Sequence, residues 1–200
     1  MTKIFVFEAQ SHEKEAFENL KTQHDLTLLY EPLKVENAAQ YANAEIISTF
    51  IYSDLSLPTL RQLPALRMIA TRSTGYDHID TDYCHEHGIV VSNVPIYGEN
   101  TVAEHVFALL LTISHRIPEA MEKARKGPFS PEGLEGFDLC GKTLGVIGTG
   151  HIGRHVIRIA KGFGMLVMAY DAHIDDYLAD QAGFSYAPLN EVLHAADILS

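Results

Sequence analysis

Apolar and polar positions alternate between strand-like runs and helical stretches over the first hundred residues. Short runs rich in β-branched and aromatic residues fall at 3–9, 25–31, 45–53, 67–75 and 89–95. Helical spacing characterises the stretches between them, at 11–24, 36–44, 57–66 and 78–88. Strands that alternate with helices are typical of βαβ units. The pattern therefore predicts an α/β fold with one doubly wound parallel sheet and helices on both faces.

A long helix is predicted next, over residues 100–127. Its first half is apolar on nearly every side, which is typical of a helix buried between layers, domains or subunits. Its second half is charged and runs into a Gly/Pro-rich link at 126–136. We therefore predict two lobes, residues 1–99 and 100–200.

The strand and helix alternation starts again in the second lobe. Strands are predicted at 142–148, 165–171, 184–187 and 197–200, and helices at 151–164, 175–183 and 188–196. An open parallel sheet that binds a dinucleotide normally has about six strands. The second lobe is therefore predicted to hold the first half of such a sheet and a trace of the second.

The segment GTGHIG at 148–153 follows a predicted strand and opens a predicted helix. In a dinucleotide-binding loop, Gly148 permits the tight turn, Gly150 lets a pyrophosphate approach the backbone, and Gly153 lets helix and strand pack closely. The N–H groups of His151 and Ile152 then point at the anion from the helix N-terminus. The alternative is a glycine-rich turn that holds no ligand.

Asp171 ends the next predicted strand, 18 residues after Gly153. An acid at this spacing accepts hydrogen bonds from the adenosine ribose and repels a 2′-phosphate. The loop and the acid together predict NAD, rather than NADP, as the cofactor. The alternative for Asp171 is a cap at the strand end, and the His151 side chain is expected to face solvent or the cofactor phosphates.

Composition narrows the class of partner. The 200 residues include 26 acidic and 15 basic side chains, for a formal net charge of −11. This balance argues against nucleic acid and against an anionic membrane surface as partners. The apolar runs are shorter than the roughly 20 residues that span a bilayer, and the apolar N-terminal stretch is too short for a signal peptide.

Cysteine and histidine spacings predict no metal site. Cys84 and Cys140 lie far apart, and no Cys/His zinc spacing is present, so free thiols in a reducing cytoplasm are expected. His85 and His87, which lie near His78, are two residues apart on a predicted helix and so do not share a face.

Two long segments resemble the D-isomer-specific 2-hydroxyacid dehydrogenase family. They are TRSTGYDHIDTDYCHEHGIVVSNVPIYGENTVAEHVFALLL and LGVIGTGHIGRHVIRIAKGFGMLVMAYD. Within the family, FIYSDL, RSTGYDHID and NVPIYGENTVAEH are most similar to D-lactate dehydrogenases. The resemblance implies a flavodoxin-like substrate lobe and a Rossmann NAD-binding lobe. It also implies hydride transfer between nicotinamide and a small D-2-hydroxy or 2-oxo acid, with D-lactate and pyruvate the leading pair.

The resemblance assigns substrate contacts to the first lobe. The turn of Ser73, Thr74 and Gly75 is expected to offer backbone N–H groups to the substrate carboxylate. The alternative is an ordinary βα turn without a ligand. Tyr52 and Tyr97 are expected to line the pocket. The alternative is that each tyrosine is a packing residue with its hydroxyl in water.

Thr101 is expected to lie near the nicotinamide. The T-x-x-E spacing of Thr101 and Glu104 also predicts a capping box at the start of the long helix. The family resemblance implies that this helix joins two subunits of a homodimer, and burial within one subunit is the alternative.

The resemblance places the catalytic arginine, glutamate and histidine of the family beyond the fourth strand of the second lobe. None maps into residues 1–200, so the chain alone is expected to be inactive. We expect an N-terminal fragment of a longer protein, with natural truncation as the alternative. A second function also stays open, an NAD-sensing binding protein of the superfamily that resembles its corepressors and lacks catalysis.

Overall fold

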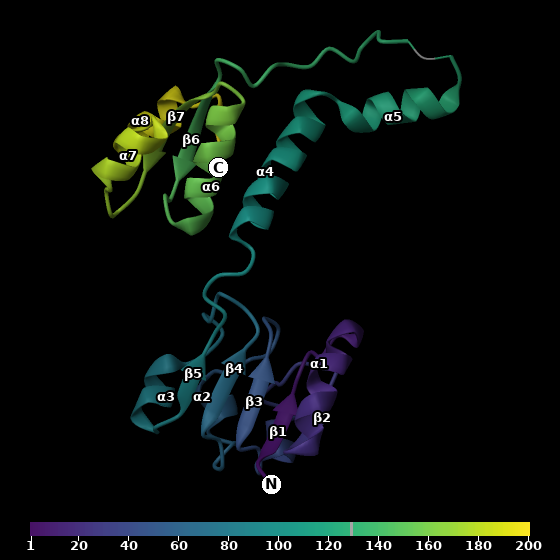
Figure 1. Cartoon of the computed structure of the whole chain (residues 1–200), viewed down its shortest axis with the longest axis vertical. Coiled ribbons are helices and arrows are strands. Elements are labelled where there is room, and N and C mark those ends of the chain that lie inside the picture. The colour runs from purple at the N-terminus through teal and green to yellow at the C-terminus, as the bar shows by residue number, and fades with distance from the viewer. Residues whose placement is uncertain (129) are drawn as a thin grey trace. The chain divides into compact units, whose positions relative to one another are not determined.

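The computed structural model describes residues 1–128 and 130–200. They form two compact units, Met1–Tyr97 and Gly98–Ser200, and each unit contains a parallel sheet with helices (Figure 1). The predicted α/β class with parallel sheets is confirmed. Within the predicted link at 126–136, residue 129 lies outside the described residues.

Five parallel strands form the sheet of the first unit. Their spatial order is β2-β1-β3-β4-β5, which is the 2-1-3-4-5 order of flavodoxin-like sheets. In chain order the strands are β1 Lys3–Val6, β2 Asp25–Leu28, β3 Ile46–Thr49, β4 Met68–Thr71 and β5 Val90–Ser92. Parallel strands bring their carboxyl ends to one edge (Figure 1), and ligands of open α/β sheets bind at that edge.

Helices of the first unit are shorter than the sequence pattern predicts. They are α1 Lys14–Glu18, α2 Leu57–Leu60 and α3 Thr81–Glu86, with 3-10 turns η1 Ser11–Glu13, η2 Asn19–Thr22 and η3 Ala38–Tyr41. Pro58 lies in the first turn of α2, where proline is favoured. The helix ends at Leu60, where the bonding tightens: the Gln62 N–H donates to the Thr59 carbonyl and the Leu63 N–H to the Leu60 carbonyl, both at 3.0 Å.

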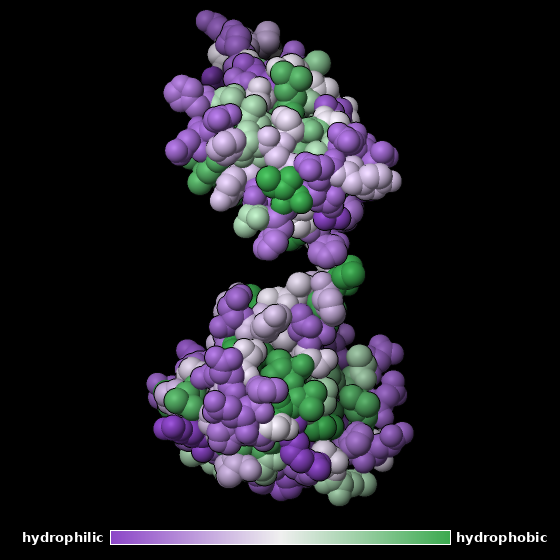
Figure 2. Space-filling model, turned by 90° about the vertical axis from the view of Figure 1, so that its left-hand side faces the viewer, coloured by the Kyte–Doolittle hydropathy of each residue, from purple (hydrophilic) through white to green (hydrophobic). Residues whose placement is uncertain are grey.

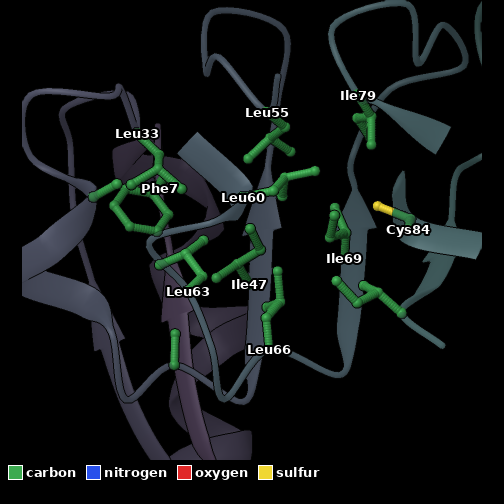
Figure 3. Close-up of a cluster of buried hydrophobic side chains, with 13 residues drawn as sticks. Phe7, Leu33, Ile47, Leu55, Leu60, Leu63, Leu66, Ile69, Ile79 and Cys84 are labelled. Carbon is green, nitrogen blue, oxygen red and sulfur yellow. The ribbon is translucent and has the colours of Figure 1, made fainter. Parts of the chain in front are cut away.

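A buried apolar cluster supports one face of this sheet. Ile47 of β3 and Ile69 of β4 are in register, and both are fully buried. Figure 3 shows these side chains pointing toward others from α2, α3 and the connecting loops. The labelled members are Phe7, Leu33, Ile47, Leu55, Leu60, Leu63, Leu66, Ile69, Ile79 and Cys84. Burial of each large side chain stabilises the fold by about 1.5–3 kcal/mol, so the loops at the carboxyl edge rest on a rigid base.

The second unit has four parallel strands in the order β8-β7-β6-β9. This is the 3-2-1-4 order that begins a Rossmann sheet. The strands are β6 Thr143–Ile147, β7 Leu166–Tyr170, β8 Ser185–Tyr186 and β9 Ile198–Leu199. The connecting helices are α6 His151–Gly162, α7 Asp176–Ala182 and α8 Leu189–Ala195. Each of the strands and helices predicted between residues 142 and 200 is present.

The predicted single helix over 100–127 is wrong, because the chain forms two helices there. They are α4 Glu99–Ser114 and α5 Ile117–Lys126, and Arg116 between them has a left-handed backbone with φ of 50°. Pro118 cannot donate to the Ser114 carbonyl. That carbonyl instead accepts a hydrogen bond from the Phe137 N–H at 3.0 Å, so the later chain satisfies the end of α4.

Burial of α4 is one-sided within the described chain. Ala103 and Phe107 are buried and belong to the core that α6 shares, and the Phe107 ring stacks on Phe163. Leu109 and Ile113 are 54% and 69% exposed. The all-round apolar character of α4 is therefore not explained by packing inside this unit.

On the molecular face that Figure 2 shows, hydrophobic side chains are scattered among hydrophilic ones over both units. None of the described helices is both long enough and apolar enough to cross a membrane.

Candidate functional site

The glycine loop joins β6 to α6 in the way the sequence predicts. Gly148 has φ of +98°, a conformation that favours glycine. Its N–H donates to the Tyr170 carbonyl at the end of β7, at 2.8 Å. Gly150 is the N-cap of α6 and has an extended backbone. The loop therefore turns tightly over the carboxyl ends of β6 and β7.

Two of the glycines differ in what surrounds them. A Cβ on Gly153 would collide with the Gly148 carbonyl, so the helix approaches the loop too closely for any side chain. A Cβ on Gly150 would meet no protein atom within 4 Å. Glycine at 153 is thus explained by packing, whereas packing leaves Gly150 unexplained. The open space at Gly150 fits a group that approaches the backbone from outside the chain.

The N-terminus of α6 is arranged to receive an anion. Gly150 has no side chain to cap the helix, and the first turn of a helix has N–H groups without intrahelical acceptors. These groups belong to His151, Ile152 and Gly153, and the helix dipole adds positive potential there. An anion such as a phosphate is the kind of group that such N–H groups can hold.

The His151 side chain is 74% exposed and its Nδ1 lies 3.3 Å from Glu99 Oε1 in the first turn of α4. It thus faces solvent and a carboxylate. At the N-terminus of α6, His151 therefore contributes its backbone N–H and not its imidazole.

Asp171 follows β7 and is bound to the glycine loop. Its Oδ2 accepts hydrogen bonds from Thr149 N at 2.6 Å and Thr149 Oγ1 at 2.9 Å, and its Oδ1 accepts one from His173 N at 2.9 Å. The N–H groups of His173 and Thr149 and the Thr149 hydroxyl lower the pKa of this carboxyl from 3.8 to about 2. Asp171 therefore stays ionised at neutral pH. The strand-end cap is present, and a carboxylate has further lone pairs with which to accept ribose hydroxyls.

Sequence reasoning missed three side chains that hold this loop. Thr149 is buried, and its hydroxyl lies 2.8 Å from the Tyr186 hydroxyl. Arg154 Nε donates to the Thr149 carbonyl at 3.0 Å, and Arg154 also pairs with Asp175 at 3.3 Å. The position of a threonine between two glycines was the available signal for Thr149. No local pattern marks Tyr186, which lies 37 residues away.

A second cluster lies at the carboxyl edge of the first sheet. Ser73, Thr74 and Gly75 form the turn that follows β4; Ser73 is buried, while Thr74 and Gly75 are exposed. Among the residues that the structure describes, the Thr74 and Gly75 N–H groups donate to no backbone carbonyl. The turn therefore presents unsatisfied donors at the edge where ligands bind.

Hydroxyl groups connect this turn to the loop that follows β3. Thr71 Oγ1 donates to the Phe50 carbonyl at 3.2 Å and lies 2.6 Å from Ser73 Oγ. Ser73 Oγ also lies 2.7 Å from the Gly75 carbonyl, and its single proton is given either to that carbonyl or to Thr71 Oγ1. The residue 50–53 loop, which carries Tyr52, is thus bound to the residue 73–75 turn.

The two predicted pocket tyrosines are not packing residues in the described chain. Tyr52 is 72% exposed and Tyr97 is 59% exposed. Tyr52 follows β3, and Tyr97 follows β5 as the last residue of the first unit. Neither ring is buried, so the packing alternative does not hold within its own unit.

The predicted capping box at Thr101 is wrong. The helix begins at Glu99 with Gly98 as the N-cap, so Thr101 is an exposed third residue of α4. Glu104 accepts a hydrogen bond from Asn100 Nδ2 instead. Gly98, Glu99 and Asn100 start the helix before Thr101 is reached. The T-x-x-E spacing could not reveal this earlier start. A place for Thr101 near the nicotinamide stays a prediction.

Within the described residues, no three His, Cys, Asp or Glu side chains are gathered in a way that could hold a metal ion. Cys84 is buried and Cys140 is exposed, and neither is in a disulfide.

Comparison with known sequences gives one family. Residues 4–186 match the family model described as "D-isomer specific 2-hydroxyacid dehydrogenase, catalytic domain". The chain is 35% identical over 203 residues to a 2-hydroxyacid dehydrogenase homolog of Zymomonas mobilis, and 35% identical over 202 residues to the D-lactate dehydrogenase of Escherichia coli. Each alignment covers 99% of this chain and 61% of the relative. The chain thus spans less than two thirds of the length of these relatives.

Comparison with solved structures finds members of the same family. The apo form of Escherichia coli D-lactate dehydrogenase matches with a TM-score of 0.81 at 33% identity, over 99% of this chain and 64% of that one. The Aquifex aeolicus D-lactate dehydrogenase, complexed with NAD and lactic acid, matches with a TM-score of 0.86 at 33% identity, over 98% of this chain and 59% of that one. On its sequence, its two sheet orders and its glycine loop, the chain belongs to the D-isomer-specific 2-hydroxyacid dehydrogenase family.

Proposed function

We propose that this chain supplies the substrate-binding and NAD-binding parts of an oxidoreductase. The enzyme transfers a hydride between nicotinamide and a small D-2-hydroxy or 2-oxo acid, and D-lactate and pyruvate are the proposed pair. The observation that carries the proposal is the uncapped N-terminus of α6 beside the open space at Gly150. The similar Aquifex aeolicus structure contains NAD and lactic acid, which supports the same ligands here.

The residues of the second unit fit NAD. The N–H groups of His151, Ile152 and Gly153 would hold the pyrophosphate, and Asp171 would accept the ribose hydroxyls. A carboxylate that is ionised at neutral pH repels a 2′-phosphate, so NAD is favoured over NADP. Bound NAD supplies the hydride acceptor, and the chain's own residues orient it.

The residues of the first unit fit a small carboxylate. The N–H groups of Thr74 and Gly75 are free to donate to the substrate carboxylate. The exposed rings of Tyr52 and Tyr97 would limit the size of the substrate side chain, which favours the methyl group of pyruvate or lactate.

We further propose that the catalytic arginine, glutamate and histidine of the family are supplied by residues outside 1–200. None of the described site residues takes a proton-transfer role in this proposal, and residues 1–200 alone are expected to be inactive.

The exposed apolar side chains of α4 and α5 support a homodimer. Val102, Leu109, Ile113, Ile117 and Met121 are each 40% to 69% exposed, and a second copy of α4 would cover them. The unpaired thiols of Cys84 and Cys140 are in keeping with a reducing cytoplasm.

The direct test uses the protein as the cell makes it. Oxidation of NADH, which carries the hydride, is followed by its absorbance with pyruvate and with larger 2-oxo acids. We expect oxidation of NADH with pyruvate and slower oxidation with bulkier acids. If NAD binds and no 2-oxo acid is reduced, the protein is an NAD-sensing binding protein instead.

A further inference from the structure

Glu8 is a buried carboxylate with an unusual backbone. It follows β1 at the carboxyl edge of the first sheet and is 4% exposed. Its φ is 55°, and Arg116 is the one other non-glycine residue of the described chain with positive φ. A left-handed backbone is costly for a residue with a side chain. Such strain persists where surrounding contacts hold it in place.

The Glu8 side chain binds the loop that follows β3. Oε1 accepts a hydrogen bond from Tyr52 N at 2.7 Å. Oε2 accepts hydrogen bonds from Phe50 N at 3.0 Å, Ser53 N at 3.2 Å and Ser53 Oγ at 2.6 Å. One carboxylate therefore accepts from four donors on three residues of the residue 50–53 loop, across more than 40 residues of sequence.

These contacts also decide the charge of Glu8. Burial raises the pKa of its carboxyl, but the hydrogen bonds from the Ser53 hydroxyl and from the Tyr52, Phe50 and Ser53 N–H groups outweigh burial, so the pKa lies below the ordinary value. The carboxylate is thus ionised and stabilised by aligned N–H groups.

The Glu8 main chain is bound to Arg72, the residue before the residue 73–75 turn. The Arg72 guanidinium donates to the Glu8 carbonyl at 2.9 Å and to the Phe7 carbonyl at 3.0 Å. Its Nε also pairs with Glu13 Oε1 at 2.9 Å. Because Arg72 directly precedes Ser73, Glu8 connects the residue 50–53 loop to the residue 73–75 turn.

We propose that Glu8 is a positioning residue for the substrate site, which fixes the residue 50–53 loop so that the Tyr52 ring meets the substrate. This inference rests on the proposed function. Glu8 itself touches no substrate; its carboxylate acts through the Tyr52 N–H and its carbonyl through Arg72. The buried carboxylate and the strained backbone together hold two loops in one arrangement.

The test is Glu8→Gln in the protein as the cell makes it. An amide placed in this site keeps one acceptor oxygen but directs its NH₂ group at a loop N–H, and two donors cannot bond. We expect the KM for the 2-oxo acid to rise about tenfold with kcat within about twofold, since one hydrogen bond to a charged group is lost. The KM for NADH is expected to stay unchanged, and hydrogen exchange of the residue 50–53 amides is expected to accelerate.

Glu45→Gln is the matched control. Glu45 Oε1 accepts from Lys3 N at 3.1 Å and Oε2 pairs with Arg67 at 2.5 Å, all at the amino edge of the same sheet. This variant also loses a carboxylate bound to a backbone N–H, but it leaves the substrate loops alone. Both kinetic constants are expected to match those of the wild type.

Three outcomes separate the possibilities. Unchanged KM and unchanged amide exchange in an active Glu8→Gln protein overturn the positioning role and leave the proposed function standing. A wild-type protein without activity toward any 2-oxo acid overturns the proposed function, and this inference with it. If Glu8→Gln does not fold, Ser53→Ala removes one of the four donors, and an unchanged KM in that variant overturns the proposal.

Discussion

The Asp171 carboxylate accepts hydrogen bonds from both the N–H and the hydroxyl of Thr149, the residue between Gly148 and Gly150. The two contacts join the end of β7 to the turn between β6 and α6. The residue proposed to bind the ribose therefore also shapes the loop proposed to bind the pyrophosphate. Substitutions of Asp171 are therefore expected to change both the affinity for the cofactor and the stability of the second unit.

Asp171→Ala is expected to weaken NAD binding about tenfold or more, because a charged acceptor is lost. The same change is expected to reduce the discrimination against NADP. Calorimetric titration with each dinucleotide measures both effects. Asp197→Ala is the matched control, since the Asp197 carboxylate also accepts from a backbone N–H, that of Thr143 at 2.8 Å, but does so at the start of β6, away from the glycine loop. An unaltered preference for NAD in Asp171→Ala contradicts the ribose assignment.

The low pKa of Asp171 predicts an acid-sensitive loop. The pKa is about 2 in the folded chain against an ordinary value of 3.8. The ionised carboxylate therefore stabilises the folded form above pH 3.8, and this contribution is lost as the pH falls toward about 2. Thermal unfolding of wild type and Asp171→Asn at several pH values measures it. We expect a gap in Tm at pH 7 that narrows below pH 4, and a gap that is independent of pH rules the assignment out.

Gly150 and Gly153 are expected to respond differently to a side chain. Gly150→Val should abolish NAD binding and lower Tm only slightly, because the added Cβ meets no protein atom and the remaining cost is that of valine as a poorer N-cap than glycine. Gly153→Ala should destabilise the fold by about 2 kcal/mol, because the added methyl group meets the Gly148 carbonyl. Calorimetry and thermal unfolding of both variants give the comparison. Retained NAD binding in Gly150→Val speaks against a pyrophosphate at this loop.

Tyr97→Ala is expected to raise activity toward bulkier 2-oxo acids relative to pyruvate, since removal of an exposed ring enlarges the proposed pocket. The ratio of kcat/KM values for a branched 2-oxo acid and pyruvate measures this. Tyr30→Ala is the control, because Tyr30 is similarly exposed at 71% but follows β2, which lies at the opposite side of the sheet from β5. The same substrate profile in Tyr97→Ala and wild type removes Tyr97 from the pocket.

Ile113→Asp is expected to break the proposed homodimer. Ile113 is 69% exposed on α4, and a buried charge without a partner strongly disfavours association. Sedimentation velocity should show a dimer for wild type and a monomer for the variant. Ile174→Asp, at a 64% exposed position outside α4, should remain dimeric. A monomeric wild type contradicts the proposed interface.

Strong local patterns predicted most of the fold. The alternation around Ile47 and Ile69 gave the buried strands, and the buried face of Val156, Ile157 and Ala160 gave α6. The start and end of helices depended on chemistry outside the pattern. Pro118 divides the long helix because its missing N–H leaves the Ser114 carbonyl free for Phe137. Thr101 failed as a cap because Gly98 had already started α4.

Side chains of the site were predictable where they belong to a short motif. Gly148 and Asp171 could be found because their spacing follows from the path of one βαβ unit. Glu8 could not, since its donors at Phe50, Tyr52 and Ser53 become neighbours only when β1 and β3 pair. Tyr186 was missed for the same reason.

The most direct measurement of the central claim is a titration with NAD that reports on individual amides. The N–H groups of residues 150–153 are followed by NMR while NAD is added to the protein as the cell makes it. Saturable shifts of these amides, with a dissociation constant equal to that from calorimetry, are the expected result. If NAD binds while these amides stay unperturbed, or if it does not bind, the helix N-terminus of α6 is not the pyrophosphate site and the proposed dehydrogenase function fails.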